Sequence, residues 1–135
     1  MPSRRMAREL ALQALFSIEV GHREAADVLD EYLASHAENA DRLFVKNLVL
    51  GTMEHAAASE AIFAPLLQGW TIDRLPTIDR LLLRMATYEL QYHPQTPRAV
   101  VINEAIELAK KFSTEDSGRF VNGVLSAIGA HHAST

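Results

Sequence analysis

The amino-acid sequence predicts an all-α protein. In almost every segment the apolar residues recur every three or four positions, which is the period of a helix that buries one face. No five-residue run alternates between apolar and polar side chains, as a half-buried strand would require. Hydrophobic residues make up 48% of the 135 residues and charged residues 22%, which is the balance of a folded globular protein.

The first half of the chain is expected to form three or four helices. Ser3 is a suitable N-cap for a helix that runs to about residue 20, and Gly21 ends it. A short acidic helix should span about residues 24–36. A third apolar pattern runs from about residue 40 to residue 67 and fits either one bent helix or two.

The best candidate boundary between two halves is the segment from Gly69 to Pro76, which contains Trp70 and breaks the helical pattern. We therefore expect a single domain over residues 1–135. Its N-terminal half should cover residues 1–68 and its C-terminal half residues 77–130, joined near residues 69–76.

The second half is expected to form three helices. Thr77 can cap a helix whose apolar residues cover far more than one face, so this helix should be central and buried. Thr96 followed by Pro97 predicts the start of a helix that runs to about residue 112. Ser113 and Asp116 have the spacing of a capping box for a last helix to about residue 128.

Composition excludes several kinds of chemistry. The chain has no cysteine, so it has no disulfide, no thiolate nucleophile and no cysteine-ligated metal. The six glycines never cluster into a phosphate-binding loop, and the six histidines show no metal-ligand spacing, so no cofactor or metal is expected. No apolar run approaches the roughly 18 residues that cross a bilayer, which predicts a soluble cytoplasmic protein.

The basic charge of the chain is concentrated at its N-terminal tip. The net charge is −4, yet residues 1–8 contain Arg4, Arg5 and Arg8 and no acid. At about 100° per residue the three arginines fall within an arc of roughly 100° and are expected to share one outward surface. Cations oppose the dipole at a helix N-terminus, whereas an RNA phosphate docked there would be favoured. A solvated basic tail is the alternative that the residues leave open.

A second polar segment joins the last two predicted helices. Lys110, Lys111 and Arg119 surround acidic and hydroxyl side chains there and could extend a phosphate-binding surface. Ordinary helix capping with solvated charges is the alternative, and Phe120 fits a core position as well as a stacking platform for RNA. The residues of interest are Asp116, Ser117, Arg119, Phe120 and Asn122.

Catalysis is the weakest hypothesis. Glu89 and His55 lie on apolar helix faces, and a buried carboxylate needs a partner or a raised pKa. No second acid, base or nucleophile can be placed beside Glu89, so we favour a non-enzymatic protein.

Four stretches, in this order, resemble the NusB family of bacterial transcription antitermination factors. They are Arg4-Arg5-Met6-Ala7-Arg8 leading into residues 11–16, Leu83 to Leu90, Ile102 to Lys110, and Asp116 to Leu125. The resemblance covers nearly the whole chain, although residues 21–70 match only in their helix pattern.

The resemblance implies an all-α fold of about seven helices in two packed bundles. It implies a non-enzymatic factor that pairs with ribosomal protein NusE, binds single-stranded boxA RNA, and helps RNA polymerase read through terminators, notably in ribosomal RNA operons. It places the RNA contacts at Arg4, Arg5, Arg8, Asp116, Ser117, Arg119, Phe120 and Asn122. It places NusE contacts at Asp79 and Phe16, where phenylalanine replaces a tyrosine common in the family and lacks its hydroxyl.

A helical protein interaction module is the alternative, for instance a homodimer that does not bind RNA. In that case the arginines would be solvated or would pair with acids of a second subunit. The acidity outside residues 1–8 also fits a basic ribosomal partner, so both hypotheses include a protein surface.

Overall fold

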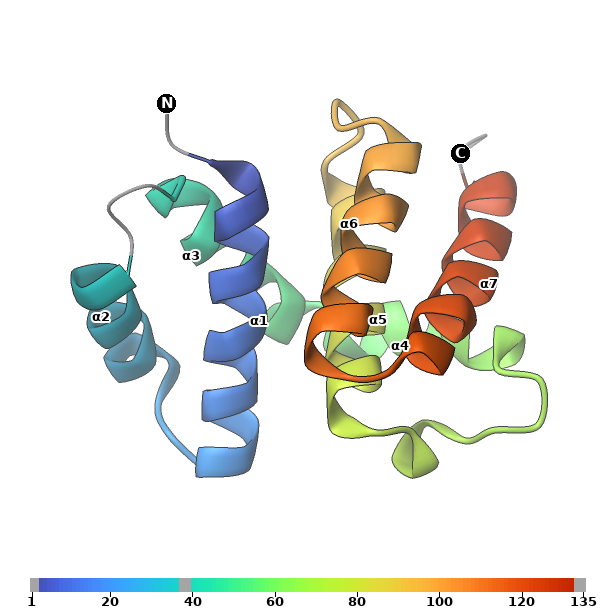
Figure 1. The fold of residues 1–135 in the computed structure, drawn as a ribbon, viewed down its shortest axis with the longest axis horizontal. Coiled ribbons are helices and arrows are strands. Elements are labelled where there is room, and N and C mark those ends of the chain that lie inside the picture. The colour runs from blue at the N-terminus through green and yellow to red at the C-terminus, as the bar shows by residue number, and fades with distance from the viewer. Residues whose placement is uncertain (1–2, 37–39, 133–135) are drawn as a thin grey trace. The chain divides into compact units, whose positions relative to one another are not determined.

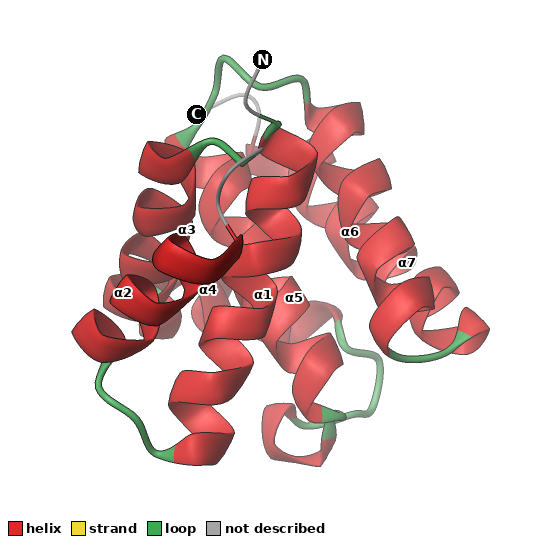
Figure 2. Cartoon of the chain, turned by 60° about the vertical axis from the view of Figure 1, so that its left-hand side comes forward, coloured by secondary structure: helices red, strands yellow, loops and turns green. Residues whose placement is uncertain are grey.

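The computed structural model describes residues 3–36 and 40–132, and within these ranges the chain is built of helices (Figure 1). Short loops and turns connect the helices (Figure 2), and the described residues contain no strand beyond an isolated bridge between Ser3 and Ala40. The prediction of an all-α protein is therefore confirmed. None of the described helices has both the length and the apolar character needed to cross a membrane.

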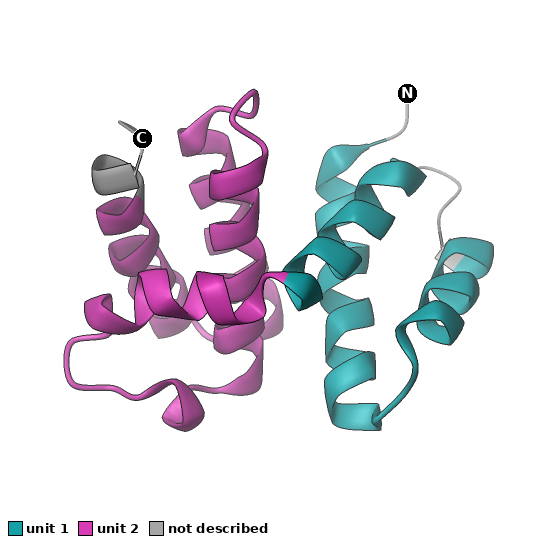
Figure 3. Cartoon of the chain, turned by 180° about the vertical axis from the view of Figure 1, so that it is seen from behind, with its two compact units in different colours: residues 1–54 teal, residues 55–135 magenta. Residues whose placement is uncertain are grey.

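The chain divides into two compact units, residues 1–54 and residues 55–135 (Figure 3). The third apolar pattern forms two helices, α3 (Arg42–Glu54) and α4 (Ala56–Phe63), and the division falls between them. The predicted junction at residues 69–76 lies inside the second unit instead, because α4 packs against α5 (Thr77–Tyr92) and α7 (Glu115–His132).

The first unit consists of α1 (Arg4–Gly21), α2 (Ala25–His36) and α3, which pack against one another in pairs. The predicted N-cap is confirmed, since the Oγ of Ser3 accepts a hydrogen bond from the amide of Met6 at 3.1 Å. After Gly21 the backbone of His22 adopts the left-handed conformation, with φ of 52°, and its amide donates to the carbonyl of Ile18. The left-handed residue is therefore one position later than the glycine.

The starts of α1 and α3 are tied together by the carbonyl of Ser3. It accepts from the amide of Ala7 at 3.2 Å and from the amide of Asp41 at 3.1 Å. The carboxylate of Asp41 in turn accepts from the amide of Phe44 at 3.1 Å and so caps α3. These bonds place the first turn of α3 beside the first turn of α1.

The second unit contains α4, α5, α6 (Arg98–Phe112) and α7, with short 3-10 turns η1 (Ala64–Leu66) and η2 (Ile72–Arg74). Helix α5 contacts α4, α6 and α7, and every residue from Leu81 to Glu89 except Arg84 is buried. The prediction that this helix is central and buried is therefore confirmed. Helices α6 and α7 lie side by side, joined by a tight connection (Figure 1).

The predicted caps of this unit are each displaced. Thr77 is the first residue of α5 rather than its cap, and α6 begins at Arg98, after Pro97, with no side-chain cap. Thr114 caps α7 in place of Ser113, because its Oγ1 accepts from the amide of Ser117 at 3.0 Å. Sequence spacing locates a helix start, but the backbone path into the helix selects the capping residue.

Candidate nucleic-acid interface

Two of the three N-terminal arginines lie over one aromatic ring of α3. The guanidinium carbon of Arg4 is 4.2 Å from the ring centroid of Phe44, and that of Arg8 is 5.3 Å from it. Arg4 also approaches Asp41, with 3.7 Å between Nε and Oδ2. A cation is attracted to the face of an aromatic ring, so Phe44 fixes the direction of both side chains.

The expectation that all three arginines share an outward surface is wrong for Arg8. Arg4 and Arg5 are exposed, whereas only 5% of Arg8 is accessible to solvent. On the helix wheel Arg8 flanks the buried face, and Phe44 packs from α3 onto that side. Arg8 therefore lies beneath the protein surface, and the solvent-accessible positive charge at the start of α1 comes from Arg4 and Arg5. The first turn of α1 contains no acid that would offset them.

Ser117 and Asp79, expected to contact RNA and NusE, are both buried and bonded to each other. The hydroxyl of Ser117 donates to Oδ2 of Asp79 at 3.0 Å, and only 6% and 4% of these residues are exposed. The hydroxyls of Ser113 and Thr114 lie 2.8 Å and 3.2 Å from that of Ser117. This network joins the beginning of α7 to the first turn of α5, so it does not form an open contact surface.

Arg119, Asp116 and Asn122 lie on the exposed part of α7. Arg119 and Asp116 form an ion pair with each other, and most of both side chains is in solvent. Asn122 accepts a hydrogen bond from the hydroxyl of Ser126 at 3.0 Å. An exposed pair of this kind stabilises the protein by at most about 1 kcal/mol, so Arg119 can exchange Asp116 for another anion at little cost.

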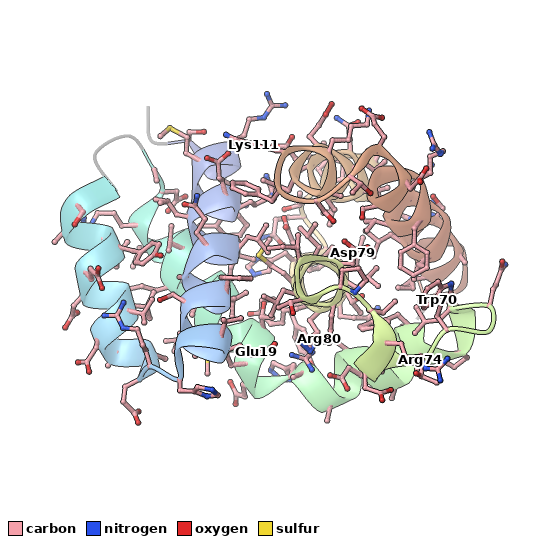
Figure 4. The ribbon with its side chains drawn as sticks, turned by 60° about the horizontal axis from the view of Figure 1, so that its bottom comes forward. Glu19, Trp70, Arg74, Asp79, Arg80 and Lys111 are labelled. Atoms are coloured by element: carbon pink, nitrogen blue, oxygen red, sulfur yellow. The ribbon has the colours of Figure 1, made fainter. Side chains whose placement is uncertain are left out.

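Phe120 is half-buried and lines a groove of about 410 Å³ on the second unit. Trp70, on the segment that precedes α5 (Figure 4), lines the same groove and is 55% exposed. The remaining lining residues come from η1, its following turn and α7: Pro65, Leu66, Leu67, Gln68, Arg119, Gly123, Val124 and Ala127.

Sequence reasoning missed the contribution of Trp70 and Phe44. Trp70, the sole tryptophan of the chain, lies in a break of the helical pattern, where the sequence gives no sign of its neighbours. Phe44 matches any core position on a helix, so no sequence signal distinguishes it as the ring beneath two arginines.

Three further residues were singled out by the sequence: Phe16 for NusE binding, and Glu89 and His55 for catalysis. Phe16, expected to contact NusE, is 38% exposed on α1. Glu89 is buried in α5 and has an interaction partner. The ring of His55 stacks on those of Tyr88 and Tyr92, at centroid distances of 5.7 Å and 4.3 Å. No group of three His, Asp or Glu side chains in the described part of the chain is arranged to hold a metal ion.

Comparison with known proteins identifies the family. The model of the NusB family matches residues 5–130. The chain belongs to the NusB family. It is 42% identical over 132 residues to the transcription antitermination protein NusB of Elusimicrobium minutum, with 95% of this chain and 94% of that protein covered. It is 44% identical over 124 residues to NusB of Halalkalibacterium halodurans, with 92% and 91% covered.

Solved NusB structures share the fold. T. maritima NusB superimposes with a TM-score of 0.88 at 36% identity, and the match covers 98% of this chain and 95% of that one. A second structure contains antitermination factors NusB and NusE in complex with double-stranded RNA. It matches with a TM-score of 0.84 at 27% identity, over 96% of this chain and 97% of that one. The chain therefore shares the all-helical fold of these NusB structures.

Proposed function

We propose that this chain is a transcription antitermination factor that binds boxA-type single-stranded RNA together with ribosomal protein NusE. Its role would be to promote read-through by RNA polymerase in the cytoplasm, notably in ribosomal RNA operons. Membership of the NusB family supports this proposal, as does a structural relative solved with NusE and RNA. The observation that carries it is the pair of exposed arginines, Arg4 and Arg5, at the N-terminus of α1.

The arginine cluster has the chemistry of a phosphate-binding surface. Exposed guanidinium groups donate two parallel hydrogen bonds to a phosphate, and the positive end of α1 favours an anion at the same place. Phe44 holds Arg4 and Arg8 in position from below, which lowers the entropy lost when RNA binds. Arg119 on α7 provides a further exposed cation on the second unit.

The proposed activity requires no catalysis. The ring of His55 stacks on that of Tyr92, and Glu89 is buried within α5. In the NusE-binding role Phe16 would offer its exposed ring. Asp79 would act by holding Ser117 rather than as an open acidic contact, because it is buried.

The salt dependence of RNA binding tests the proposal. If three to five phosphates are neutralised, the plot of log K against log of salt concentration should have a slope of roughly −2 to −3.5 with single-stranded RNA. We expect the double variant Arg4→Ala, Arg5→Ala to weaken binding and to reduce that slope by about 1.4, since each lost phosphate contact removes about 0.7. The assay is fluorescence anisotropy of labelled boxA RNA titrated with the chain and NusE at several salt concentrations.

Arg23→Ala is the matched control, because Arg23 is a partly exposed arginine of the same unit that pairs with Glu31 instead. It should leave the slope unchanged. Arg8 is left intact because its burial would confuse loss of binding with loss of folding. An unchanged slope in the double variant would show that the RNA is bound elsewhere.

A homodimer is a second candidate, favoured by an exposed apolar stripe on α3. Leu43 is 80% exposed, and Leu50 and Met53 follow on the same side of the helix at 47% and 43%. Surface apolar residues grouped in this way are typical of protein interfaces. Light scattering of the purified chain should report a dimer that Leu43→Glu dissociates. A monomer at all concentrations would exclude this candidate.

A further inference from the structure

One of the residues that line the groove beside Trp70 is a glycine, Gly123, which has no side chain. Gly123 lies within α7, and a Cβ atom placed on it would have no heavy atom within 4 Å apart from its two chain neighbours and the nearby backbone of its own helix. Gly118 on the same helix differs, because a Cβ there would lie 3.1 Å from the Lys110 side chain of α6. Close helix packing explains Gly118 but not Gly123.

Glycine weakens a helix interior relative to alanine, so a glycine in open space needs another reason. Gly123 lines the groove, and a missing side chain lets a bound molecule approach the backbone closely. The position therefore fits a ligand that lies flat against α7.

The groove presents two aromatic rings around this gap. Trp70 comes from the segment before α5 and Phe120 from α7, three residues before Gly123. The loop that carries Trp70 reverses direction at Gln68 and Gly69, which have φ values of 49° and 94°, and the amide of Trp70 donates to the carbonyl of Leu67 at 3.3 Å. Its indole nevertheless remains more than half exposed. An exposed tryptophan on an ordered turn is typical of a binding surface.

Arg119 adds a cation to the lining, and Gln68 adds an amide. Aromatic faces, a hydrogen-bonding amide and a cation together match a nucleotide, which has a planar base and an anionic phosphate. An acidic peptide would match Arg119 but would leave the aromatic faces without a planar partner.

We propose that this groove binds one unpaired nucleobase of the RNA, stacked on Trp70 and lying over Gly123, with Arg119 at the adjoining phosphate. This inference rests on the proposed RNA-binding function and assigns a base-binding role to Trp70 and Gly123. The segment 116–122 adjoins the same groove, so the base site continues the surface that resemblance assigns to RNA.

The fluorescence of the sole tryptophan gives a direct test. Titration of the 135-residue chain and NusE with single-stranded boxA RNA should quench the emission of Trp70, after subtraction of any NusE signal. The nucleotides of the RNA are then replaced one at a time with an abasic nucleotide. The quenching should be lost when the replacement is at one particular position. Abasic nucleotides at the other positions should leave it in place.

Variants then separate stacking from folding. Trp70→Leu should weaken RNA binding, measured by anisotropy, by roughly 5-fold to 150-fold, and Trp70→Phe should lose less because a ring remains. Tyr92→Leu is the control, since Tyr92 is 50% exposed on the same unit and does not line the groove. Gly123→Ala should weaken binding by about 5-fold or more while the melting temperature stays equal or rises.

The possible outcomes are distinct. RNA binding without quenching, or wild-type affinity in Gly123→Ala and Trp70→Leu, would overturn the base site and leave the proposed function intact. Quenching by NusE alone, with no further change on adding RNA, would assign the groove to a protein and also overturn it. Absence of RNA binding by the wild-type chain with NusE would refute both the function and the base site.

Discussion

Ser117→Ala separates a structural role of Ser117 from a direct RNA contact. The hydroxyl of Ser117 donates to the buried carboxylate of Asp79 at 3.0 Å. The other oxygen of that carboxylate, Oδ1, has no hydrogen-bond partner among the described residues. Removing the hydroxyl therefore leaves a buried carboxylate without the donor that the structure provides for it.

The expected cost follows from the charge of the acceptor. A hydrogen bond to a charged group stabilises a protein by about 1.5 to 3 kcal/mol, compared with about 1 kcal/mol between neutral groups. Because Asp79 is only 4% exposed, water cannot replace Ser117 without rearrangement of α7. We therefore expect Ser117→Ala to lower the free energy of unfolding by about 1.5 to 3 kcal/mol.

Urea denaturation measures this loss, and two further variants interpret it. Ser126→Ala removes a serine hydroxyl from the same helix, but this hydroxyl bonds to the exposed Asn122, so the cost should be below about 0.5 kcal/mol. In an Asp79→Ala background, Ser117→Ala should also cost little, since the charged acceptor is gone.

Equal costs for Ser117→Ala and Ser126→Ala, or equal costs with and without Asp79, would refute the reasoning. A folded Ser117→Ala protein of unchanged stability that had lost RNA affinity would instead show that Ser117 contacts RNA directly.

Three further predictions concern α3, the α4–α5 contact and the end of α1. Phe44→Leu keeps every charge but removes the aromatic ring that Arg4 and Arg8 contact. RNA affinity, measured by anisotropy, should therefore fall by about 2-fold to 5-fold. Unchanged affinity would mean that the ring does not position the two arginines. Glu60→Gln should destabilise the chain to urea by about 1 to 2 kcal/mol, because Arg84 keeps its charge in a site where its side chain is only 19% exposed. Adding Arg84→Met should recover part of that loss, and no recovery would argue against the pair. His22→Gly should raise the free energy of unfolding by about 0.5 to 1 kcal/mol, since glycine adopts φ of 52° without strain; a decrease in thermal or urea stability would contradict this.

The candidate site was only partly visible in the sequence. Arg4 and Arg5 could be found because they form an acid-free run at the start of a helix, which is a local property. The burial of Arg8 depends on Phe44, a residue 36 positions later that reaches it only when α1 and α3 pack. The bond between Ser117 and Asp79 likewise joins residues 38 positions apart. Neither pairing has a spacing that a sequence pattern could reveal.

The amino-acid sequence alone determined the all-α class, the buried character of α5 and the extent of most helices, because helical periodicity depends on residues within a turn or two of each other. Only the tertiary structure decided which residues cap α5, α6 and α7 and where the chain divides into units. It also decided that Trp70, Phe120 and Gly123 line one groove. The caps depend on the backbone path into each helix. The division into units and the groove depend on contacts between segments far apart in the chain, and such contacts form only when the helices pack.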